Sequence, residues 1–306
     1  MLGLKWRYDI SINSKALSDQ NLVDNIRSAE PISQEMVDEY YRRCISIYLN
    51  FIGIHWHTGF YLDDNKNISP VDQNRMTRCI AESIDLSQQD RVLDVGCGIG
   101  GTACYLAKEY GCMVNGLTPV ETQRETAFEL ISKFGVEDRV TIDLGHASLL
   151  PYPDNSFDVV LFFESPCHFP DRQTFFNEVF RVLKPNGRMA GEDWLATDLI
   201  SKDMLKKWIQ PICKTWAIPM LGTGSCYLTQ FENAGFVNNL YVDMQSEILL
   251  SKGFSVTETQ QSQLREEIQS CQSPLLELTL EGLLSLGQAV AAGAFTIGRF
   301  IAHKPA

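Results

Sequence analysis

Four glycines lie within six residues, at Gly96, Gly98, Gly100 and Gly101, directly after an apolar run. Glycine lacks a Cβ atom, so a backbone built from it can approach a bound ligand where a side chain would collide. An apolar strand that enters such a turn just before a helix predicts a cofactor-binding loop. Asp94, inside the apolar run, adds a carboxylate that can attract a positively charged group to the loop.

The same glycines allow a dinucleotide-binding interpretation. Gly96, Gly98 and Gly101 satisfy the spacing GxGxxG, which cradles the pyrophosphate of NAD in oxidoreductases. Two features weigh against it: Asp94 occupies a strand position that is normally apolar in that fingerprint, and no acid near Leu117 could bind the NAD ribose. A purely structural glycine turn is the third alternative.

A histidine and a carboxylate follow two later apolar runs. His168 lies in ESPCHFPD, which follows the run FDVVLFF, and Asp193 lies in GEDW, which ends the next run. Imidazole can take up a proton near neutral pH, so His168 is the candidate general base. Asp193 is the candidate that orients the imidazole ring. The alternatives are a structural histidine and an ordinary carboxylate at a strand end.

Residues 91–195 alternate short apolar runs with helical stretches, which is typical of parallel strands joined by crossover helices. We therefore expect a doubly wound α/β fold that binds ligands at the carboxyl ends of its strands. A long amphipathic helix is expected after Ser33, its N-cap. The expected units are an N-terminal helical lid at 1–75, a cofactor-binding core at 76–195, a helical cap insertion at 196–230 and the rest of the sheet at 231–306.

The glycine loop resembles motif I of the class I S-adenosylmethionine-dependent methyltransferases, (D/E)xGxGxG. Asp94, Gly96, Gly98 and Gly100 match it in register. The resemblance implies S-adenosylmethionine as the cofactor and a mostly parallel, Rossmann-like sheet of seven strands. It also implies that the loop makes room for the amino-acid part of the cofactor, with Asp94 directed toward the ammonium group.

Further segments are similar to the small-molecule branch of this family, which includes tocopherol, sarcosine and antibiotic-sugar methyltransferases. GLTPVETQ, residues 116–123, resembles GxTLSxxQ and implies that Thr118 and Gln123 contact the cofactor, with Glu121 as an additional acceptor for ribose hydroxyls. GHASLLPYPDNSFD resembles a segment whose alanine, here Ala147, meets the adenine edge. His146 stands where this family usually has an acid, so it is either a replacement ligand or exposed.

The segment at residues 164–171 resembles ESxxHxxD of the same branch, which implies that Glu164 lies at the cofactor and His168 at the acceptor. HWHTGFY, residues 55–61, resembles a segment that closes over the cofactor, which adds Tyr61. For His55 we expect simple packing. The acceptor is expected in an apolar chamber, although the same rings could pack the cap's own core instead. The chamber residues are Tyr40, Tyr41, His57, Trp208, Trp216 and Tyr227.

Composition restricts the partners. Lys and Arg number 26 against 38 Asp and Glu, a formal charge of −12 that argues against nucleic acid and anionic membranes. Nine cysteines, an odd number without a CxxC pair, favour a reducing cytoplasm, and no metal site is expected. The opening MLGLKWRYDI has charges where a signal peptide needs an apolar stretch.

The expected function is O-methylation of a bulky, largely apolar small molecule that derives from polyketide or peptide synthesis. The two ends of the chain resemble O-methyltransferases of microcystin-type toxin pathways, which would place the hydroxyl on a long aromatic, polyketide-derived side chain. C-methylation in the same fold is the first alternative, and NAD-dependent oxidation is the second.

Overall fold

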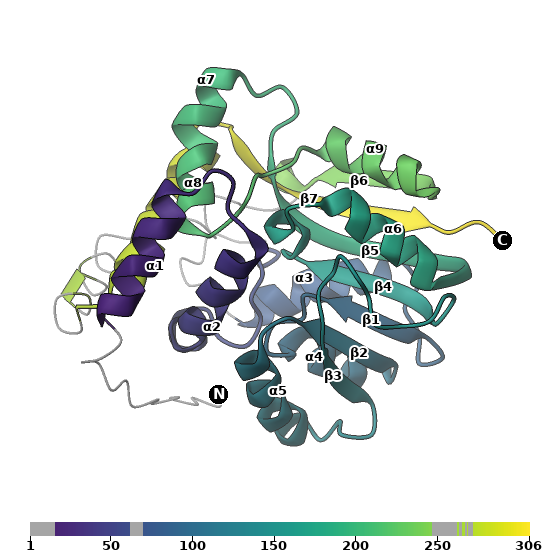
Figure 1. Cartoon of the computed structure of the whole chain (residues 1–306). Coiled ribbons are helices and arrows are strands. Elements are labelled where there is room, and N and C mark those ends of the chain that lie inside the picture. The colour runs from purple at the N-terminus through teal and green to yellow at the C-terminus, as the bar shows by residue number, and fades with distance from the viewer. Residues whose placement is uncertain (1–15, 62–69, 247–261, 263–264, 267, 269–271) are drawn as a thin grey trace.

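A seven-stranded sheet forms the centre of the computed structural model, which describes residues 16–61, 70–246, 262, 265, 266, 268 and 272–306 (Figure 1). The strand order is β3-β2-β1-β4-β5-β7-β6, in which β1 to β5 pair in parallel and β7 is antiparallel to both β5 and β6. This confirms the expected α/β class. The strands are β1 Arg91–Val95, β2 Met113–Thr118, β3 Val140–Leu144, β4 Phe157–Phe163, β5 Leu183–Ala196, β6 Val237–Asp243 and β7 Phe295–His303.

Helices cover both faces of the sheet (Figure 1). One face packs against α3 (Pro70–Glu82), α4 (Gly101–Tyr110) and α5 (Glu121–Phe134), and the other against α6 (Arg172–Val182) and α9 (Gly224–Ala234). Both faces are apolar because the central strands are buried on both sides, as parallel strands between helix layers must be.

A third apolar cluster joins the remaining helices into a cap beyond one end of the sheet (Figure 1). It contains α1 (Ala16–Ser28), α2 (Gln34–Phe51), α8 (Gln210–Thr215) and α12 (Pro274–Ala291). The short α7 (Lys202–Met204) and a π-helical turn (Leu205–Ile209) lead into α8. Ser33 caps α2 as expected, because its Oγ accepts a hydrogen bond from the backbone N–H of Met36 at 3.4 Å.

The packing places some segments in other units than the sequence predicted. Helix α3 crosses the expected boundary at residue 75 and packs mainly on the sheet. Helix α9 crosses the boundary at 230 and also belongs to the core, since Tyr227 and Phe231 pack against α6. Helix α12 lies within 231–306 yet packs in the cap against α1 and α8.

Tyr227, on α9, packs in the hydrophobic core between the sheet and its helices and does not line an acceptor chamber. Its side chain is fully buried and stacks on Phe300 with ring centroids 4.8 Å apart. Its hydroxyl donates a hydrogen bond to Asp193 Oδ2 at 2.5 Å. The same ring packs edge-on against Phe176 and Phe231. Tyr227 therefore belongs neither to an acceptor chamber nor to the cap's own core, which was the sequence alternative, but to the apolar layer between the sheet and α6.

We predict that Tyr227→Ala lowers the free energy of unfolding by about 3–5 kcal/mol, the usual cost of deleting a buried aromatic ring. Urea denaturation followed by circular dichroism measures the change. Leu199→Ala is the matched control: Leu199 is 98% exposed, so its truncation should change stability by less than about 0.5 kcal/mol. Equal stability of the two variants would contradict the core assignment of Tyr227.

Candidate functional site

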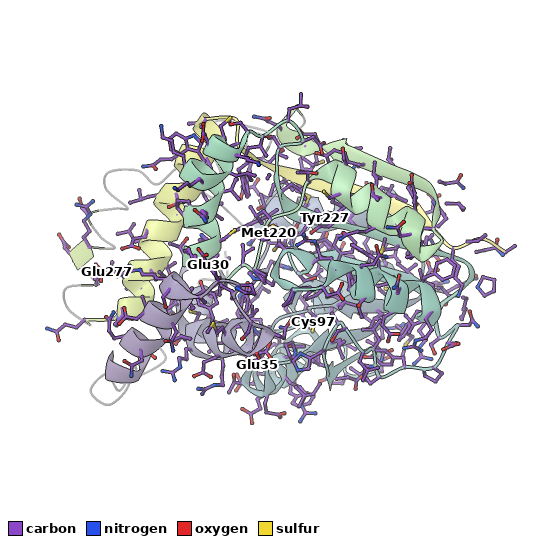
Figure 2. All side chains as sticks on the ribbon, turned by 45° about the horizontal axis from the view of Figure 1, so that its top comes forward. Glu30, Glu35, Cys97, Met220, Tyr227 and Glu277 are labelled. Atoms are coloured by element: carbon purple, nitrogen blue, oxygen red, sulfur yellow. The ribbon has the colours of Figure 1, made fainter. Side chains whose placement is uncertain are left out.

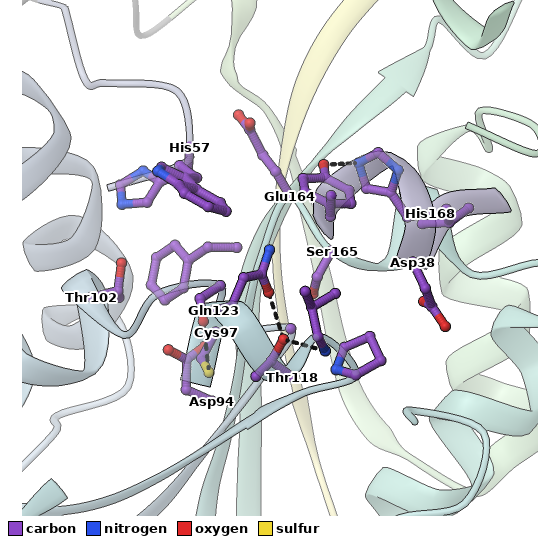
Figure 3. A pocket seen from close by; sticks show the side chains of 18 of the residues that line it. Asp38, His57, Asp94, Cys97, Thr102, Thr118, Gln123, Glu164, Ser165 and His168 are labelled. Atoms are coloured by element: carbon purple, nitrogen blue, oxygen red, sulfur yellow. Dashed lines mark hydrogen bonds between the residues drawn. The ribbon is translucent and has the colours of Figure 1, made fainter. Parts of the chain in front are cut away.

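A pocket of about 90 Å³ opens where the carboxyl ends of β1, β2 and β4 meet α2 and the segment that follows it (Figure 3). It brings together most of the predicted site residues, because parallel strands deliver their ends to one edge of a sheet. The predicted residues that line the pocket are Asp94, Gly96, Gly98, Thr118, Gln123, Glu164, His168, Tyr41 and His57.

The glycine loop has the geometry of a cradle. Gly96, Gly98 and Gly100 have φ of 78°, 55° and 78°, a left-handed conformation that residues with a Cβ rarely adopt. A Cβ on Gly96 would collide with Ser165, whose hydroxyl donates to the Val95 carbonyl at 2.7 Å. Gly100 does not line the pocket; it is the N-cap residue of α4 and supports the loop from below.

The segment after α2 lies directly on this loop. A Cβ on Gly98 would lie 3.1 Å from the ring of Trp56, and a Cβ on Gly101 would collide with the carbonyl oxygen of Ile54. Gln73 holds the segment from α3, because its side-chain amide donates to the carbonyls of His55 and His57. Residues 53–58 therefore form the roof of the pocket. The resemblance of HWHTGFY to a segment that closes over the cofactor predicted such a position for residues 55–61.

Asp94 is a buried carboxylate with an oxygen that has no protein partner. Its side chain is 2% exposed, and Oδ2 accepts no hydrogen bond. Burial raises the pKa of Asp94 to about 7. A cation in the pocket would satisfy Oδ2 and return the carboxyl to its charged form, as expected if this acid faces the ammonium group of a cofactor.

Thr118 and Gln123 form one hydrogen-bonded pair at the end of β2. The Thr118 hydroxyl donates to Gln123 Oε1 at 2.5 Å and accepts from the backbone N–H of Val120 at 3.2 Å. Both side chains are buried, so the pair fixes the turn into α5 (Figure 3). Glu121 does not line the pocket and pairs with Arg124 at 2.6 Å on the surface.

His146 and Ala147 lie beside the pocket and do not line it. His146 Nε2 is 3.8 Å from Asp38 Oδ2, a contact that joins α2 to the turn after β3. Ala147 packs against the apolar cluster under α6. Their roles at the adenine end therefore remain predictions from the family resemblance.

His168 is a buried imidazole in the 3-10 turn η1 (Pro166–His168) after β4. Its Nε2 lies 2.7 Å from the Tyr41 hydroxyl, the hydrogen bond drawn at His168 in Figure 3. Its Nδ1 lies 3.5 Å from the carbonyl oxygen of Ala217. Burial lowers the pKa of His168 to about 4, so the ring is neutral at pH 7. We assign the proton to Nδ1, which can donate only to the carbonyl, so Nε2 accepts from Tyr41.

The predicted pairing of His168 with Asp193 is not formed. Asp193 accepts hydrogen bonds from the Tyr227 hydroxyl at 2.5 Å and from the backbone N–H of Trp194 at 2.8 Å. Burial raises the pKa of Asp193 to about 6. The Ala217 carbonyl takes the place of the carboxylate at His168 Nδ1, so the ring is oriented by a neutral acceptor from the cap.

Glu164 has an unusual backbone and a tethered side chain. Its φ is 47°, a strained conformation for a residue with a Cβ, and such conformations concentrate at functional sites. Its Oε1 accepts the backbone N–H of Thr58 at 2.7 Å, which connects β4 to the roof segment. Burial raises the pKa of Glu164 to about 7.

The His57 ring supports this roof from behind and is not free to bind an acceptor. Its Nδ1 donates to the Thr58 carbonyl at 3.0 Å, and its Nε2 lies 3.2 Å from the Thr77 hydroxyl. Burial lowers the pKa of His57 to about 4, so the ring is neutral. His55 packs against Thr102 and Tyr105, as expected from the sequence.

A further acid was not singled out from the sequence. Glu192 on β5 is fully buried, and neither of its carboxyl oxygens has a hydrogen-bond partner. Its Oε1 is 4.0 Å from His57 Nδ1. Burial, together with the nearby Glu164 and Asp193, raises the pKa of Glu192 well above its usual range. The segment GEDW could have indicated this site, because Glu192 is an acid within an otherwise apolar strand pattern.

Several residues expected in the acceptor chamber or at the cofactor lie elsewhere. Tyr40 is fully buried beside Tyr48, with the two hydroxyls 3.3 Å apart. Trp216 packs edge-on against Trp194 in the cap core, and Trp208 lies under Lys207. Tyr61 is buried below the roof, where its hydroxyl accepts from the Gly59 N–H at 3.1 Å. Figure 2 shows that Tyr227 and Cys97 lie in separate parts of the molecule.

Known proteins share this fold and these motifs. Residues 93–191 match a family described as a methyltransferase domain. The 27-O-demethylrifamycin SV methyltransferase of Amycolatopsis mediterranei (strain S699) is 39% identical over 143 residues, which are 47% of this chain and 52% of that protein. The sarcosine/dimethylglycine N-methyltransferase of Halorhodospira halochloris is 31% identical over 199 residues, 63% of this chain and 70% of that protein.

A solved structure extends the similarity to nearly the whole fold. A putative sarcosine dimethylglycine methyltransferase from Galdieria sulphuraria has a TM-score of 0.76 at 25% identity, covering 88% of this chain and 98% of that chain. The chain belongs to the class I S-adenosylmethionine-dependent small-molecule methyltransferases. The sequence matches extend over 36% to 57% of the length of the first four curated relatives.

The residues present fit S-adenosylmethionine. Asp94 Oδ2 has no protein partner, so it can accept a hydrogen bond from the ammonium group of the cofactor. The glycines with positive φ leave room for the cofactor's amino-acid part. Membership in the methyltransferase family therefore favours S-adenosylmethionine over NAD as the cofactor of the glycine loop. Within the described residues, no three or more His, Cys, Asp and Glu side chains are grouped as metal ligands. None of the helices described is both long and apolar enough to span a membrane.

We predict that Gly98→Val weakens S-adenosylmethionine binding by about 100-fold or more, because the β-branched side chain would occupy the cradle beside Trp56. Asp94→Ala should also weaken it, by removing the charge that faces the ammonium group. Isothermal titration measures both. Gly135→Val is the matched control, since Gly135 has a similar φ of 68° at the end of α5 with open space around it. Native affinity in the Gly98 variant would refute the cradle.

Proposed function

We propose that this chain transfers a methyl group from S-adenosylmethionine to a hydroxyl of a bulky, largely apolar natural-product intermediate, with His168 as the general base. The observation that carries the proposal is the contact between His168 Nε2 and a hydroxyl, that of Tyr41, inside the pocket that also holds the glycine loop. A neutral imidazole whose accepting nitrogen already receives an O–H group is arranged for removing a proton from an alcohol.

The cofactor supplies an activated methyl group, so the chain has to position the acceptor oxygen and remove its proton. Tyr41 lies on α2, which also contributes Val37 to the pocket wall. An acceptor hydroxyl that replaces the Tyr41 hydroxyl at Nε2 would lie 2.7 Å from the base, within hydrogen-bonding reach. The Ala217 carbonyl would keep the proton on Nδ1 while Nε2 accepts the second one.

The walls of the pocket support an apolar acceptor. Between the polar groups they consist of Val37, Ile54, Trp56, Phe163 and Phe169. Pockets of this composition bind ligands through apolar contact and orient them with few polar groups. Among the relatives, the name of the rifamycin enzyme specifies transfer to an oxygen, which supports O-methylation. The name of the sarcosine enzyme specifies nitrogen, so the acceptor atom needs direct measurement.

The narrower acceptor, a hydroxyl on a long aromatic side chain derived from a polyketide, stays a prediction from the resemblance of the chain ends. The opening MLGLKWRYDI lies outside the described residues. The closing segment forms β7 and the tail beyond it, away from the pocket lining. All eight cysteines in the described part of the chain are free thiols, which supports a reducing compartment such as the cytoplasm.

The direct test incubates the protein with S-adenosylmethionine labelled in its methyl group and a panel of apolar alcohols. O-methylation adds one labelled methyl group per acceptor, and its carbon shows the NMR shift of a methoxy group. C-methylation would add the same mass with the shift of a methyl group on carbon. Turnover of no acceptor despite cofactor binding would favour a binding scaffold without catalysis.

We predict that His168→Ala lowers kcat by about 10² to 10⁴-fold, the usual effect of removing a general base, and leaves the Kd for S-adenosylmethionine unchanged. Tyr41→Phe is the matched comparison because it removes only the hydroxyl that contacts the same nitrogen. It should lower kcat by less than about tenfold, since the acceptor hydroxyl takes its place. A near-native kcat for His168→Ala from pH 6 to 9 would exclude the base assignment.

A further inference from the structure

Three carboxylates and no Lys or Arg side chain line the described pocket, and its two histidines, His57 and His168, are neutral. Asp38, Asp94 and Glu164 are the acids, and neither Lys nor Arg occurs among the residues that form the wall (Figure 3). Two of the three acids sit at strand ends, Asp94 on β1 and Glu164 directly after β4, where the glycine loop and η1 hold them in place. The pocket is therefore built for a ligand with positive charge on more than one side.

We infer that Glu164 is the group that distinguishes the charged cofactor from its neutral-sulfur product, by giving up a proton when the sulfonium binds and keeping it when the thioether binds. This inference rests on the proposed function, since it places the reacting sulfur near His168. The methyl carbon has to meet the oxygen that His168 deprotonates, and Glu164 lies four residues before His168 in the same segment of the pocket wall.

The geometry around Glu164 makes its charge depend on the ligand. One oxygen accepts the Thr58 backbone N–H at 2.7 Å, and the side chains of Thr58 and Trp194 also hydrogen-bond to this carboxylate. All of these donors are neutral, so none of them supplies the positive charge that an ionised carboxylate would need. Behind it, Glu192 has two oxygens without partners and adds no compensating positive charge. The left-handed backbone of Glu164, with φ of 47°, is held by its own N–H, which donates to the Glu192 carbonyl at 2.9 Å. The side chain therefore cannot escape to solvent without releasing the roof.

The titratable groups around Glu164 come from every element packed against it. They are Glu192 and Asp193 from β5, Tyr41 from α2, His57 and Tyr61 from the segment after α2, and Cys167 and His168 from η1. Arg172 from α6 acts on Asp193 and Cys167 on the far side. The pKa values of His57 and His168, both about 4, keep these rings neutral between pH 5.5 and 7.

The sign of the pH effect follows from linkage. Burial raises the pKa of Glu164 and of Asp94 to about 7, so both acids are largely protonated in the free protein at pH 6. A bound cation lowers the pKa of the acid that it faces, so binding releases that proton and weakens as the pH falls below 7. Asp94 would respond to both ligands, because each has the ammonium group. Glu164 would respond only to the ligand whose sulfur is charged.

This arrangement matches the proton balance of the reaction. Methyl transfer to an alcohol forms one O–C bond and breaks one S–C bond, whose electron pair stays on sulfur, and the hydroxyl proton passes to His168 Nε2. Glu164 loses its cationic partner in the same step and can hold one proton again. Loss of this attraction also favours dissociation of the neutral-sulfur product, because nothing in the wall replaces the lost charge.

The experiment is isothermal titration of the full chain with S-adenosylmethionine and with S-adenosylhomocysteine, each in two buffers of different ionisation enthalpy. The difference between ligands in protons released should be close to one at pH 6 and about one half at pH 7. The ratio of the affinity for S-adenosylmethionine to that for S-adenosylhomocysteine should fall roughly fivefold when the pH is lowered from 7 to 6. The range stops at pH 7 because the amino group of both ligands titrates above it.

Glu164→Gln keeps the shape of the side chain and should abolish the difference in released protons, making the ratio of affinities independent of pH. Asp38→Asn is the matched control, since Asp38 is a second acid of the wall that, unlike Asp94, does not belong to the glycine loop, and its Oδ2 lies 3.8 Å from His146 Nε2. It should preserve the difference. Sinefungin, which has an ammonium group in place of the methylsulfonium, should behave as S-adenosylmethionine does with the unmodified chain, a measurement that needs no variant.

Equal proton release for the two ligands with the unmodified chain overturns the inference, and so does a difference that persists in Glu164→Gln. Either result leaves cofactor binding itself intact. Absence of any binding heat with S-adenosylmethionine at every pH would instead overturn the proposed function. The two failures are therefore distinguishable in one set of titrations.

Discussion

The burial of acids without basic partners is the constraint on which the rest of the site depends. Asp94, Glu164 and Glu192 lie at or near the carboxyl ends of three adjacent strands, and burial raises the pKa of each. Leaving a carboxylate charged and unpaired inside a protein is costly, so such groups hold protons or wait for a cation. The glycine loop and the roof surround two of these acids, Asp94 and Glu164, in one pocket that contains no Lys or Arg to neutralise them.

The roof, residues 53–58, connects the buried acid Glu164 to α3. The backbone N–H of Thr58 donates to Glu164, and the backbone carbonyl of Thr58 accepts from the His57 ring. Gln73 and Thr77 of α3 both hydrogen-bond to His57 and so hold residues 57 and 58 in place. Each contact is modest by itself, but the groups are buried, so losing one partner leaves the others unsatisfied. The pocket thus depends on segments from α2, α3 and β4 that are far apart in the chain.

The sequence predicted the parts of the site that local pattern determines. The glycine loop, the strand ends and the N-cap at Ser33 depend on short-range rules, and the structure confirms the fold that they imply. The partner of His168 could not be predicted, because the Ala217 carbonyl is a backbone atom that the cap brings in. Asp193 follows Glu192 on a strand, so the two point to opposite faces, and the distant Tyr227 occupies the face of Asp193. The aromatic rings of the cap were equally ambiguous, since composition does not separate a binding wall from a packed core.

The contact between Gly101 and the Ile54 carbonyl restricts how this chain can diverge. A side chain at 101 would collide with the backbone carbonyl of residue 54 and push the roof off the loop, so position 101 requires glycine whatever side chain stands at 54. Val37 of α2, in contrast, both lines the pocket and packs in the apolar cluster of the cap. The glycine loop and residues 53–58 therefore act as one mechanical unit, in which a displacement of either segment changes the shape of the pocket.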